Sequence, residues 1–372
     1  MIDGMCPSRP RVAIVHERFT EFAGSEAVVE QLARQWTDAP VLAPVGRPGV
    51  LPPDLEPRLR TTGLSRLLRG SGYAHLLPAL PVVMRHLPVP DVDVVVASHH
   101  AFATQVVHAT SAPVVAYVHS PARWVWDPSM RAGELGGRAG ELALGAFSAA
   151  FRPMDLRAAG RVHTLVANSR EVAVRIQSWW GREATVVHPP VDTDFYTPDG
   201  SVPREDFFLL AGRVVPYKRP DLAVRAAERA GVPLVVAGDG RARADTEQLA
   251  GPATRFVGRV DDEGLRDLYR RCRALLMPGI EDFGIIPVEA MACGAPVIAI
   301  DAGGARDSVV PGLSGVLVPV GGDEVGTWAE ALSGFDSAGY DPTRVRAHAE
   351  TFSRARFREQ MAGVVAQVVD QR

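Results

Sequence analysis

The sequence predicts an α/β protein of two domains, each built on a doubly wound parallel β-sheet. Short apolar runs alternate with amphipathic segments along most of the chain, and strands separated by helices usually pair in parallel. A length of 372 residues suits two domains of ordinary size, and 47% hydrophobic with 22% charged residues is a globular composition. The net charge of -3 argues against general nucleic-acid binding, so we expect no nucleic-acid partner.

The first half opens with a predicted strand at residues 11–16, a loop that contains Gly24, and a helix at 25–36. Further apolar runs predict strands at 93–97, 114–118 and 165–169. His119 directly follows the strand 114–118. Because ligands of doubly wound sheets bind beyond the carboxyl ends of the strands, His119 is a candidate site residue.

The second half repeats the alternation, with amphipathic helices predicted at 221–230 and 262–273. Its predicted strands begin at Phe208 and cover 234–237, 255–260, 274–277, 296–300 and 316–319. Several candidate residues lie at or after the ends of these strands, so we expect them around one crevice: Arg213, Lys218, Val260, Asp262, Glu281 and Glu289. Residues 197–203 have the composition of a linker, which places the domain boundary near residue 200.

The segment 280–299 carries the most chemistry. A helix is predicted to begin at Phe283-Gly284-Ile285-Ile286, and the unpaired backbone N–H groups of a helix start can hold phosphate. Glu281 lies just before this helix and Glu289 about two turns along it. Carboxylates repel phosphate, so we expect both to bind hydroxyl groups. A nucleotide sugar has hydroxyls on both sides of a pyrophosphate and therefore suits this arrangement.

Lys218 is the only lysine in the chain, which otherwise uses arginine as its cation. It lies on the turn after the strand that begins at Phe208, five residues after Arg213. A lone lysine in such a sequence indicates a position that needs a compact ammonium group rather than a planar guanidinium.

These motifs resemble those of the family 4 glycosyltransferases, retaining enzymes with the GT-B fold, in which two Rossmann-like domains face a central cleft. The resemblance rests on the glutamate-x7-glutamate element Glu281 to Glu289 and on Gly212-Arg213 with Lys218. It extends over nearly the whole chain. It implies an N-terminal acceptor domain at 1–200, a C-terminal nucleotide-sugar domain at 201–350, and a helix in 351–372 that crosses back to the first domain.

The resemblance also implies roles for the candidate residues. Arg213 and Lys218 would clamp the donor pyrophosphate, and Glu289 would bind the ribose. Glu281 and His119 would hold hydroxyls of the transferred sugar. The nucleotide base would lie against Val260 and Asp262, and the start of the helix at Phe283, Gly284, Ile285 and Ile286 would complete the donor site. Gly24 would approach the donor phosphate through its N–H, although the family's paired glycine is replaced here by Ala23.

The loop after His119 contains Arg123, Trp124 and Trp126. Aromatic faces stack on sugar rings and an arginine can hold an anionic acceptor, so these residues are candidates for acceptor binding. The alternative is that the two tryptophans only pack the interior.

The closest likeness is to bacterial mannosyltransferases that build surface polysaccharides or glycolipids, which makes GDP-mannose the first donor to consider. UDP-glucose, UDP-N-acetylglucosamine and ADP-glucose are the other donors, and the acceptor is expected to be a glycan, a lipid-linked sugar or a small molecule. A nucleotide-sugar epimerase and a silent sugar-binding protein are the rival functions. A phosphorylase is disfavoured, because it would need a lysine for its pyridoxal phosphate and the single lysine is already placed beside Arg213. A dehydrogenase is disfavoured, because residues 238–243 lack the third glycine of a dinucleotide-binding loop.

We expect neither a cofactor nor a metal ion. The two Asp-x-Asp strings, at 91–93 and 192–194, do not follow strands, as a metal-binding string would. Three cysteines without paired spacing and no visible signal peptide indicate a cytoplasmic protein. Residues 57–90 mix arginines with apolar residues, which predicts either peripheral contact with the inner membrane or a helical hairpin with one buried face.

Overall fold

A computed structural model describes residues 10–69, 72–128 and 137–371. The chain divides into two compact units, which we call unit 1 (Met1–His188 with Phe357–Arg372) and unit 2 (Pro189–Arg356). The expected boundary near residue 200 thus lies inside unit 2. The reason is local packing, since Tyr196 is buried in the core of unit 2 and Arg346 donates hydrogen bonds to the carbonyl oxygens of Thr193 and Tyr196.

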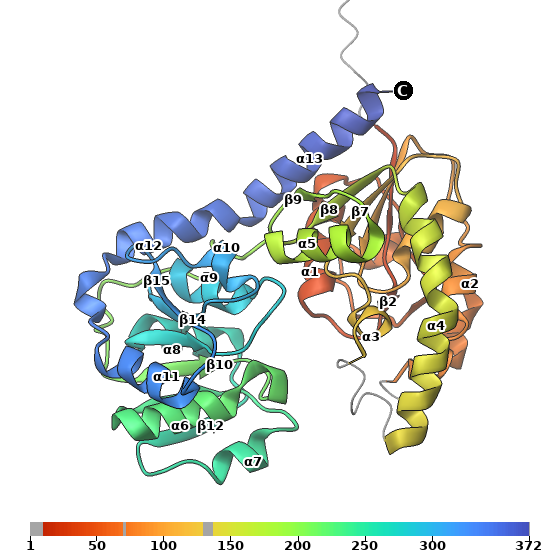
Figure 1. The fold of residues 1–372 in the computed structure, drawn as a ribbon. Coiled ribbons are helices and arrows are strands. Elements are labelled where there is room, and N and C mark those ends of the chain that lie inside the picture. The colour runs from red at the N-terminus through yellow and green to blue at the C-terminus, as the bar shows by residue number, and fades with distance from the viewer. Residues whose placement is uncertain (1–9, 70–71, 129–136, 372) are drawn as a thin grey trace, which may run out of the picture. The chain divides into compact units, whose positions relative to one another are not determined.

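Unit 1 contains a seven-stranded sheet whose strands all run parallel (Figure 1). In spatial order the strands are β5 (Leu59–Thr61), β3 (Val41–Ala43), β1 (Val12–Val15), β6 (Val94–His99), β7 (Val114–Val118), β8 (Thr164–Ala167) and β9 (Thr185–Val186). A small parallel pair, β2 (Arg18–Phe19) and β4 (Val45–Gly46), lies outside this sheet. The chain adds strands first on one side of β1 and then on the other, which is the doubly wound topology.

Helices cover both faces of this sheet. On one face Val12 and Ile14 share a core with α1 (Gly24–Gln35) and α13 (Arg354–Asp370); on the other, Ala13 and Val15 share a core with α4 (Gly137–Arg161) and α5 (Arg170–Trp180). This alternation along β1 is the two-residue period of a strand buried on both sides. The remaining helical segments are η1 (Glu56–Arg58), η2 (Gly63–Leu67), η3 (Ala74–Leu76), α2 (Leu80–Met84), η4 (Ala103–His108) and α3 (Arg123–Trp126).

Unit 2 is built in the same way on six parallel strands (Figure 1). Their spatial order is β12 (Thr254–Gly258), β11 (Leu234–Ala237), β10 (Phe208–Ala211), β13 (Ala274–Met277), β14 (Val297–Ile300) and β15 (Gly315–Val318). One core joins the sheet to α6 (Pro220–Ala230) and α11 (Glu324–Ser333), and a second joins it to α8 (Asp262–Arg271), α9 (Ile285–Ala292) and α12 (Pro342–Ala349). Short helical segments complete the unit: η6 (Pro216–Lys218), α7 (Arg243–Glu247), α10 (Ala305–Ser308), η7 (Ser337–Gly339) and η8 (Glu350–Phe352).

The order of strands reverses between β1 and β6 in unit 1 and between β10 and β13 in unit 2. In open parallel sheets, ligands bind beyond the carboxyl ends of the strands at these two points. The predicted α/β architecture of two doubly wound domains is therefore confirmed, and each unit has its own place where a functional site should form.

The expected helical hairpin in residues 57–90 is wrong. The described part of this segment contains the end of η1, the strand β5, the 3-10 turns η2 and η3, and the five-residue helix α2. Arg58 is engaged inside unit 1, where it donates to the carbonyl oxygens of Ala33, Trp36 and Ala39. Over the described residues, no helix is both long and apolar enough to cross a membrane.

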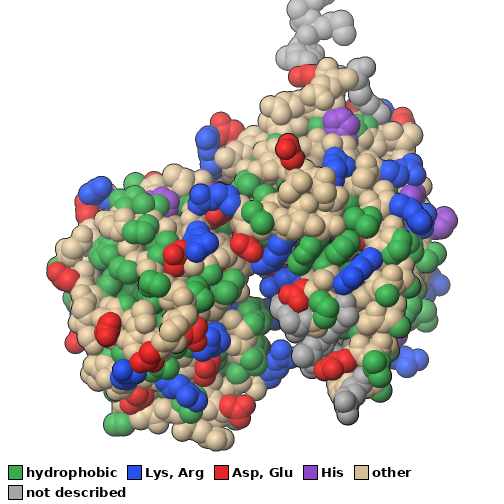
Figure 2. All heavy atoms as spheres, in the orientation of Figure 1, with side chains coloured by type: hydrophobic (Ala, Val, Ile, Leu, Met, Phe, Trp, Pro, Cys, Tyr) green, Lys and Arg blue, Asp and Glu red, His purple; other side chains and the backbone are tan. Residues whose placement is uncertain are grey.

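On the face of unit 2 drawn in Figure 2, acidic and basic side chains are interspersed rather than separated by sign.

Candidate functional site

In unit 2 the turns after β10 and β13 bring Lys218 and Glu281 together. Lys218 ends the short helix η6, and its Nζ lies 2.6 Å from Oε1 of Glu281, which follows β13. The side chains are 16% and 23% exposed, so the pair lies at the border of the protein interior. Two residues that are 63 positions apart in sequence thus meet at the reversal point of the sheet, as the sequence predicted for Lys218 and Glu281.

Glycines allow the two turns to approach so closely. A Cβ on Gly279 would lie 2.4 Å from the Cα of Lys218, and a Cβ on Gly212 would lie 2.5 Å from Cδ1 of Ile286. Gly212 also has φ +106°, a conformation that other residues rarely adopt. The position of Lys218 therefore depends on the absence of side chains at Gly212 and Gly279.

The helix α9 begins beside this pair. Gly284, at φ 85°, precedes it, and Phe283 is buried while Ile285 and Ile286 pack against the core. A helix start has backbone N–H groups without intrahelical partners, and these groups attract anions. The predicted helix start at residues 283–286 is confirmed, and it lies next to the ammonium of Lys218.

Glu289 lies deeper in unit 2 than Glu281 and has a different environment. Its Oε2 accepts a hydrogen bond from the hydroxyl of Tyr269 at 3.0 Å. Burial raises the pKa of Glu289 to about 7, even though the Tyr269 hydroxyl and Lys218 favour the charged form. The negative charges of Asp262 and Asp192 act in the same direction as burial. Asp262 and Lys218 are thus close enough to influence Glu289, which agrees with their predicted grouping.

The remaining predicted donor residues of unit 2 are at its surface. Arg213 is exposed and donates to the Tyr217 hydroxyl at 3.0 Å. Val260 is 37% exposed in the loop before α8, and Asp262 is the exposed first residue of that helix. The capping role at α8 falls to Asp261, which accepts from the Gly264 N–H, so the carboxylate of Asp262 is not used as the cap.

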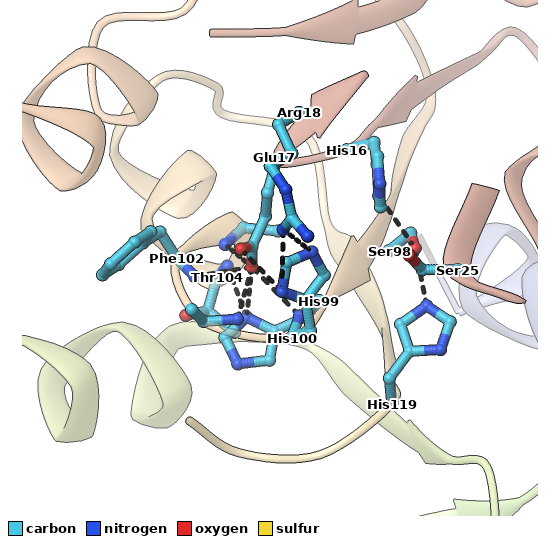
Figure 3. Close-up of polar contacts among 12 residues, drawn as sticks. His16, Glu17, Arg18, Ser25, Ser98, His99, His100, Phe102, Thr104 and His119 are labelled. Atoms are coloured by element: carbon cyan, nitrogen blue, oxygen red, sulfur yellow. Dashed lines mark hydrogen bonds and ion pairs between the residues drawn. The ribbon is translucent and has the colours of Figure 1, made fainter. Parts of the chain in front are cut away.

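In unit 1 the corresponding reversal point carries a buried carboxylate, Glu17 (Figure 3). Its Oε1 accepts from four successive backbone N–H groups of residues 100–103, at 3.0, 2.5, 2.6 and 3.0 Å. Burial alone would raise the pKa of Glu17, but His100, His99 and these N–H groups lower it well below its usual range. Glu17 thus ties the chain after β1 to the chain after β6.

His100 lies on the other oxygen of Glu17. Its Nδ1 is 3.2 Å from Oε2 of Glu17, and Arg18 donates to its Nε2 at 2.8 Å. An arginine only donates, so Nε2 must accept and the proton must be on Nδ1. Burial lowers the pKa of His100 to about 4, so the ring is neutral at physiological pH. Arg18 in turn lies over the ring of Tyr73, 4.3 Å from its centroid.

His119 follows β7, as predicted, and is joined to the same strand ends. Its Nε2 is 2.9 Å from the hydroxyl of Ser98, and that hydroxyl is 3.1 Å from Nδ1 of His16 (Figure 3). His16 in turn has Nε2 3.3 Å from Oε1 of Glu26 on α1. Burial and the neighbouring imidazoles of His100 and His16 lower the pKa of His119 to about 3, so its ring is also neutral.

Gly24 is the exposed first residue of α1, as the loop-to-helix pattern predicted. Trp124 and Trp126 lie in α3, and both make contacts within unit 1. The Trp126 indole N–H donates to Asp155 at 2.8 Å, and its ring stacks on that of Trp179. Trp124 stacks on Phe147, so both tryptophans are engaged within unit 1; Arg123, beside them, is half-buried.

Sequence reasoning missed several residues of this region. They are His16, Glu17, Glu26, Ser98, His100 and Tyr269. A signal was present in unit 1, because the predicted strand 11–16 ends at His16 and is followed by Glu17, and Ser98-His99-His100 follows the strand 93–97. Tyr269 gave no such signal, since an aromatic residue on an amphipathic helix is normally only part of the core.

Two family models match the chain, one after the other. The model described as Glycosyltransferase Family 4 matches residues 22–195, and the model described as Glycosyl transferases group 1 matches residues 197–335. The chain belongs to the family 4 glycosyltransferases. As a member of this family it has the GT-B fold, with one model on most of unit 1 and the other within unit 2.

Curated relatives of this glycosyltransferase chain include the D-inositol 3-phosphate glycosyltransferases. The protein of Mycobacterium sp. (strain KMS) is 36% identical over 191 residues, which cover 45% of this chain and 43% of that protein. The protein of Kribbella flavida is 35% identical over 201 residues, covering 45% and 47%. The chain therefore spans less than half the length of these relatives.

Solved structures show the same fold over almost the full length of the family 4 chain. Sucrose-phosphate synthase from Thermosynechococcus elongatus has a TM-score of 0.72 at 18% identity, covering 97% of this chain and 100% of that one. Anabaena HepE, solved in complex with UDP, has a TM-score of 0.70 at 18% identity, covering 96% and 100%.

Proposed function

We propose that this protein transfers a hexose from a nucleotide sugar to an acceptor hydroxyl, with retention of configuration and without a metal ion. The observation that carries the proposal is the Lys218–Glu281 pair beside the start of α9, at the reversal point of the sheet in unit 2. A cation, the N–H groups at the start of a helix and a carboxylate in one place suit a ligand that joins a diphosphate to a polyol.

Within unit 2, each group has a role that follows from its charge. Lys218 and Arg213 attract the donor diphosphate, and the N–H groups at the start of α9 add partial positive charge. As the sugar–phosphate bond breaks, negative charge grows on the departing diphosphate, and these fixed donors stabilise it without moving. Glu281, already bound to Lys218 at 2.6 Å, is placed to accept from a sugar hydroxyl, and Glu289 from the ribose.

The transfer exchanges one bond of the anomeric carbon for another. The bond from this carbon to the diphosphate oxygen breaks, and a bond to the acceptor oxygen forms on the same face. The acceptor proton passes to the departing phosphate oxygen, so no protein nucleophile is needed. In unit 1 we assign His119 to a hydroxyl of the transferred hexose, since its ring is neutral and has a hydrogen-bonding nitrogen, Nδ1, besides the one that Ser98 holds.

Two donors have specific support. The sequence motifs favour GDP-mannose, whereas UDP-glucose is favoured by the likeness to Anabaena HepE, which has been solved with UDP-glucose. The inositol-phosphate relatives support a small polyol as the acceptor beside a glycan or glycolipid. Arg123, at the start of α3, is the residue we assign to an anionic acceptor.

The test compares donors by their effect on thermal stability. GDP-mannose, UDP-glucose, UDP-N-acetylglucosamine and ADP-glucose are added separately, each with and without EDTA, because a ligand of the native state raises the melting temperature. We expect one nucleotide sugar to stabilise the protein whether or not EDTA is present. Incubation with that donor and mixed acceptors should then give a glycoside with the donor's anomeric configuration, which NMR identifies.

The variant Lys218→Ala tests the site itself. It removes the ammonium group that pairs with Glu281 and that would attract the diphosphate. Affinity for the nucleoside diphosphate should therefore fall about tenfold or more, as measured by calorimetry. Arg229→Ala is the control, because Arg229 pairs with Asp323 on the surface of the same unit. Equal affinities for the wild type and Lys218→Ala would refute the site, and conversion of the donor without an acceptor would indicate an epimerase.

A further inference from the structure

We propose that Glu26, acting through His16 and Ser98, determines which ring nitrogen of His119 carries the proton. These four residues form a chain of three hydrogen bonds, Glu26–His16 at 3.3 Å, His16–Ser98 at 3.1 Å and Ser98–His119 at 2.9 Å. The side chains of Glu26, His16 and Ser98 are almost completely buried, at 1%, 0% and 0% exposure. Glu26, His16 and Ser98 are positioning residues, and only His119 would touch a ligand.

The chain of hydrogen bonds begins at the carboxylate of Glu26, which can only accept. The Oε2 of Glu26 accepts from the Ala23 N–H at 3.1 Å and from the Ser25 hydroxyl at 2.9 Å, which leaves Oε1 for His16. Burial alone would raise the pKa of Glu26, but its hydrogen bonds with His16 and Ser25 hold that pKa at about 2. Glu26 is thus ionised, and Nε2 of His16 must carry a proton to bond to it.

The direction of the next two bonds follows. We take His16 to be a neutral imidazole with its single ring proton on Nε2, a state that the ¹⁵N shifts of its own ring test directly. A neutral imidazole with its proton on Nε2 accepts at Nδ1, so Ser98 donates its single hydroxyl proton to His16. The Ser98 oxygen can then only accept from Nε2 of His119, and the proton of His119 is therefore on Nε2.

This assignment fixes what His119 offers to a ligand. Its Nδ1 has a lone pair and no proton, and it has no hydrogen-bond partner among the residues that the structure describes. Such a nitrogen accepts a hydrogen bond from a hydroxyl and repels a phosphate oxygen. Its use to hold a sugar hydroxyl rests on the proposed function, whereas the position of the proton does not.

Glu26→Gln should reverse every bond in the chain. The two donors at Oε2, Ala23 N–H and Ser25 hydroxyl, require the amide oxygen of the new side chain on their side. The amide NH₂ then faces Nε2 of His16, which must accept, so the His16 proton moves to Nδ1. Ser98 would in turn accept from His16 and donate to Nε2 of His119, which would leave the His119 proton on Nδ1.

The test is ¹⁵N NMR of the ligand-free protein with labelled histidine, in which shifts separate protonated from unprotonated ring nitrogens. The signals of His119 are identified by their loss in His119→Gln. We expect the proton on Nε2 in the wild type and on Nδ1 in Glu26→Gln. Glu30→Gln is the matched control, because Glu30 lies on the same helix but pairs with Arg34, and it should leave His119 unchanged.

Ser98→Ala removes the link between the two histidines. In that background Glu26→Gln should no longer alter the His119 shifts, because no hydroxyl passes the change along. A wild-type proton on Nδ1, an unchanged His119 in Glu26→Gln, or an effect that persists without the Ser98 hydroxyl would each overturn the proposal. Folding of each variant is checked by its melting temperature.

Hexose transfer gives a second and separate readout. If the proposed function holds, Glu26→Gln should slow transfer about tenfold, the value of one hydrogen bond, while affinity for the nucleoside diphosphate stays unchanged. Absence of transfer by the wild type with every donor would refute the proposed function and leave the NMR result intact. Reversal of the His119 proton with an unchanged transfer rate would overturn the role of His119 in holding a hydroxyl.

Discussion

Asp155 on α4 is a buried acid with an unusual balance of partners. Its Oδ2 accepts from the indole N–H groups of Trp126 and Trp180, at 2.8 and 2.9 Å, while its Oδ1 has no partner among the described residues. Burial raises the pKa of Asp155 to about 7, although both indoles favour the charged form. The unfolded chain, with an ordinary aspartate, releases this proton near pH 4.

The variant Asp155→Asn should therefore stabilise the protein in a pH-dependent way. Between about pH 4 and pH 7 the folded wild type binds one more proton than the unfolded chain, so its stability falls as pH rises. The amide does not titrate and can still accept from both indoles. We expect the stability advantage of the variant to grow by about 2 kcal/mol from pH 5 to pH 7, measured by urea unfolding. A constant difference over this range would contradict the assignment.

At the scale of single residues, the sequence predicted those site residues whose chemical type stands out without knowledge of the fold. Lys218 stands out as the only lysine, and Glu281 as a carboxylate before a helix start. The bonds of Glu26, His16 and Ser98 could not be predicted, because they depend on which side chains are buried together. The same holds for the packing of Trp126 on Trp179, which residue type alone leaves undecided.

At the scale of elements, the seam between η6 and the turn after β13 determines where Lys218 lies. The backbone of Tyr217 and Lys218 occupies the space that a side chain at Gly279 would need, with the Tyr217 oxygen 2.5 Å from a Cβ there. Strands flanked by polar turns were placed well from the sequence, and 114–118, 234–237 and 274–277 are confirmed to the residue. The contact between two turns is not visible in a sequence, because it joins distant positions through backbone atoms.

Gly279→Ala should consequently damage the donor site more than the fold. The new methyl group overlaps the η6 backbone, which must move, at a cost of about 1–3 kcal/mol in stability. We expect nucleoside diphosphate affinity to fall along with it, because Lys218 would move away from Glu281. Gly339→Ala is the control in the same unit, since a Cβ there meets nothing within 4 Å. Unchanged affinity in Gly279→Ala, with the fold intact, would show that the seam does not position Lys218.

At the scale of the whole molecule, unit 1 consists of two segments that are far apart in sequence. Along α13, Phe357, Met361, Val365 and Val368 belong to the same core as β1 and α1. The ring of Phe357 meets the ring of Tyr117, from the middle of the sheet, edge to face at 5.5 Å. The resemblance to family 4 implied a final helix that crosses back to the first domain, and the boundary between the units lies between Arg356 and Phe357.

Phe357→Ala should weaken unit 1 selectively. Loss of this ring, which is 1% exposed, should cost about 3–5 kcal/mol. In hydrogen exchange the strands β1, β6 and β7 should lose protection, while β10 and β13 of unit 2 should keep theirs. Gln367→Ala, at an exposed position of the same helix, should change neither unit. Equal loss of protection in both units would mean that α13 does not belong to unit 1 energetically.

The return of α13 also sets the order in which the protein can mature. During synthesis, residues 189–356 emerge before residues 357–372, so unit 2 has its full sequence while unit 1 still lacks its last helix. At about 5–20 residues per second, synthesis of residues 189–356 takes roughly 10–35 s, and throughout this time the apolar face of β1 and α1 lacks the cover of α13. The part of the chain that the ribosome makes first is thus the part that finishes folding last.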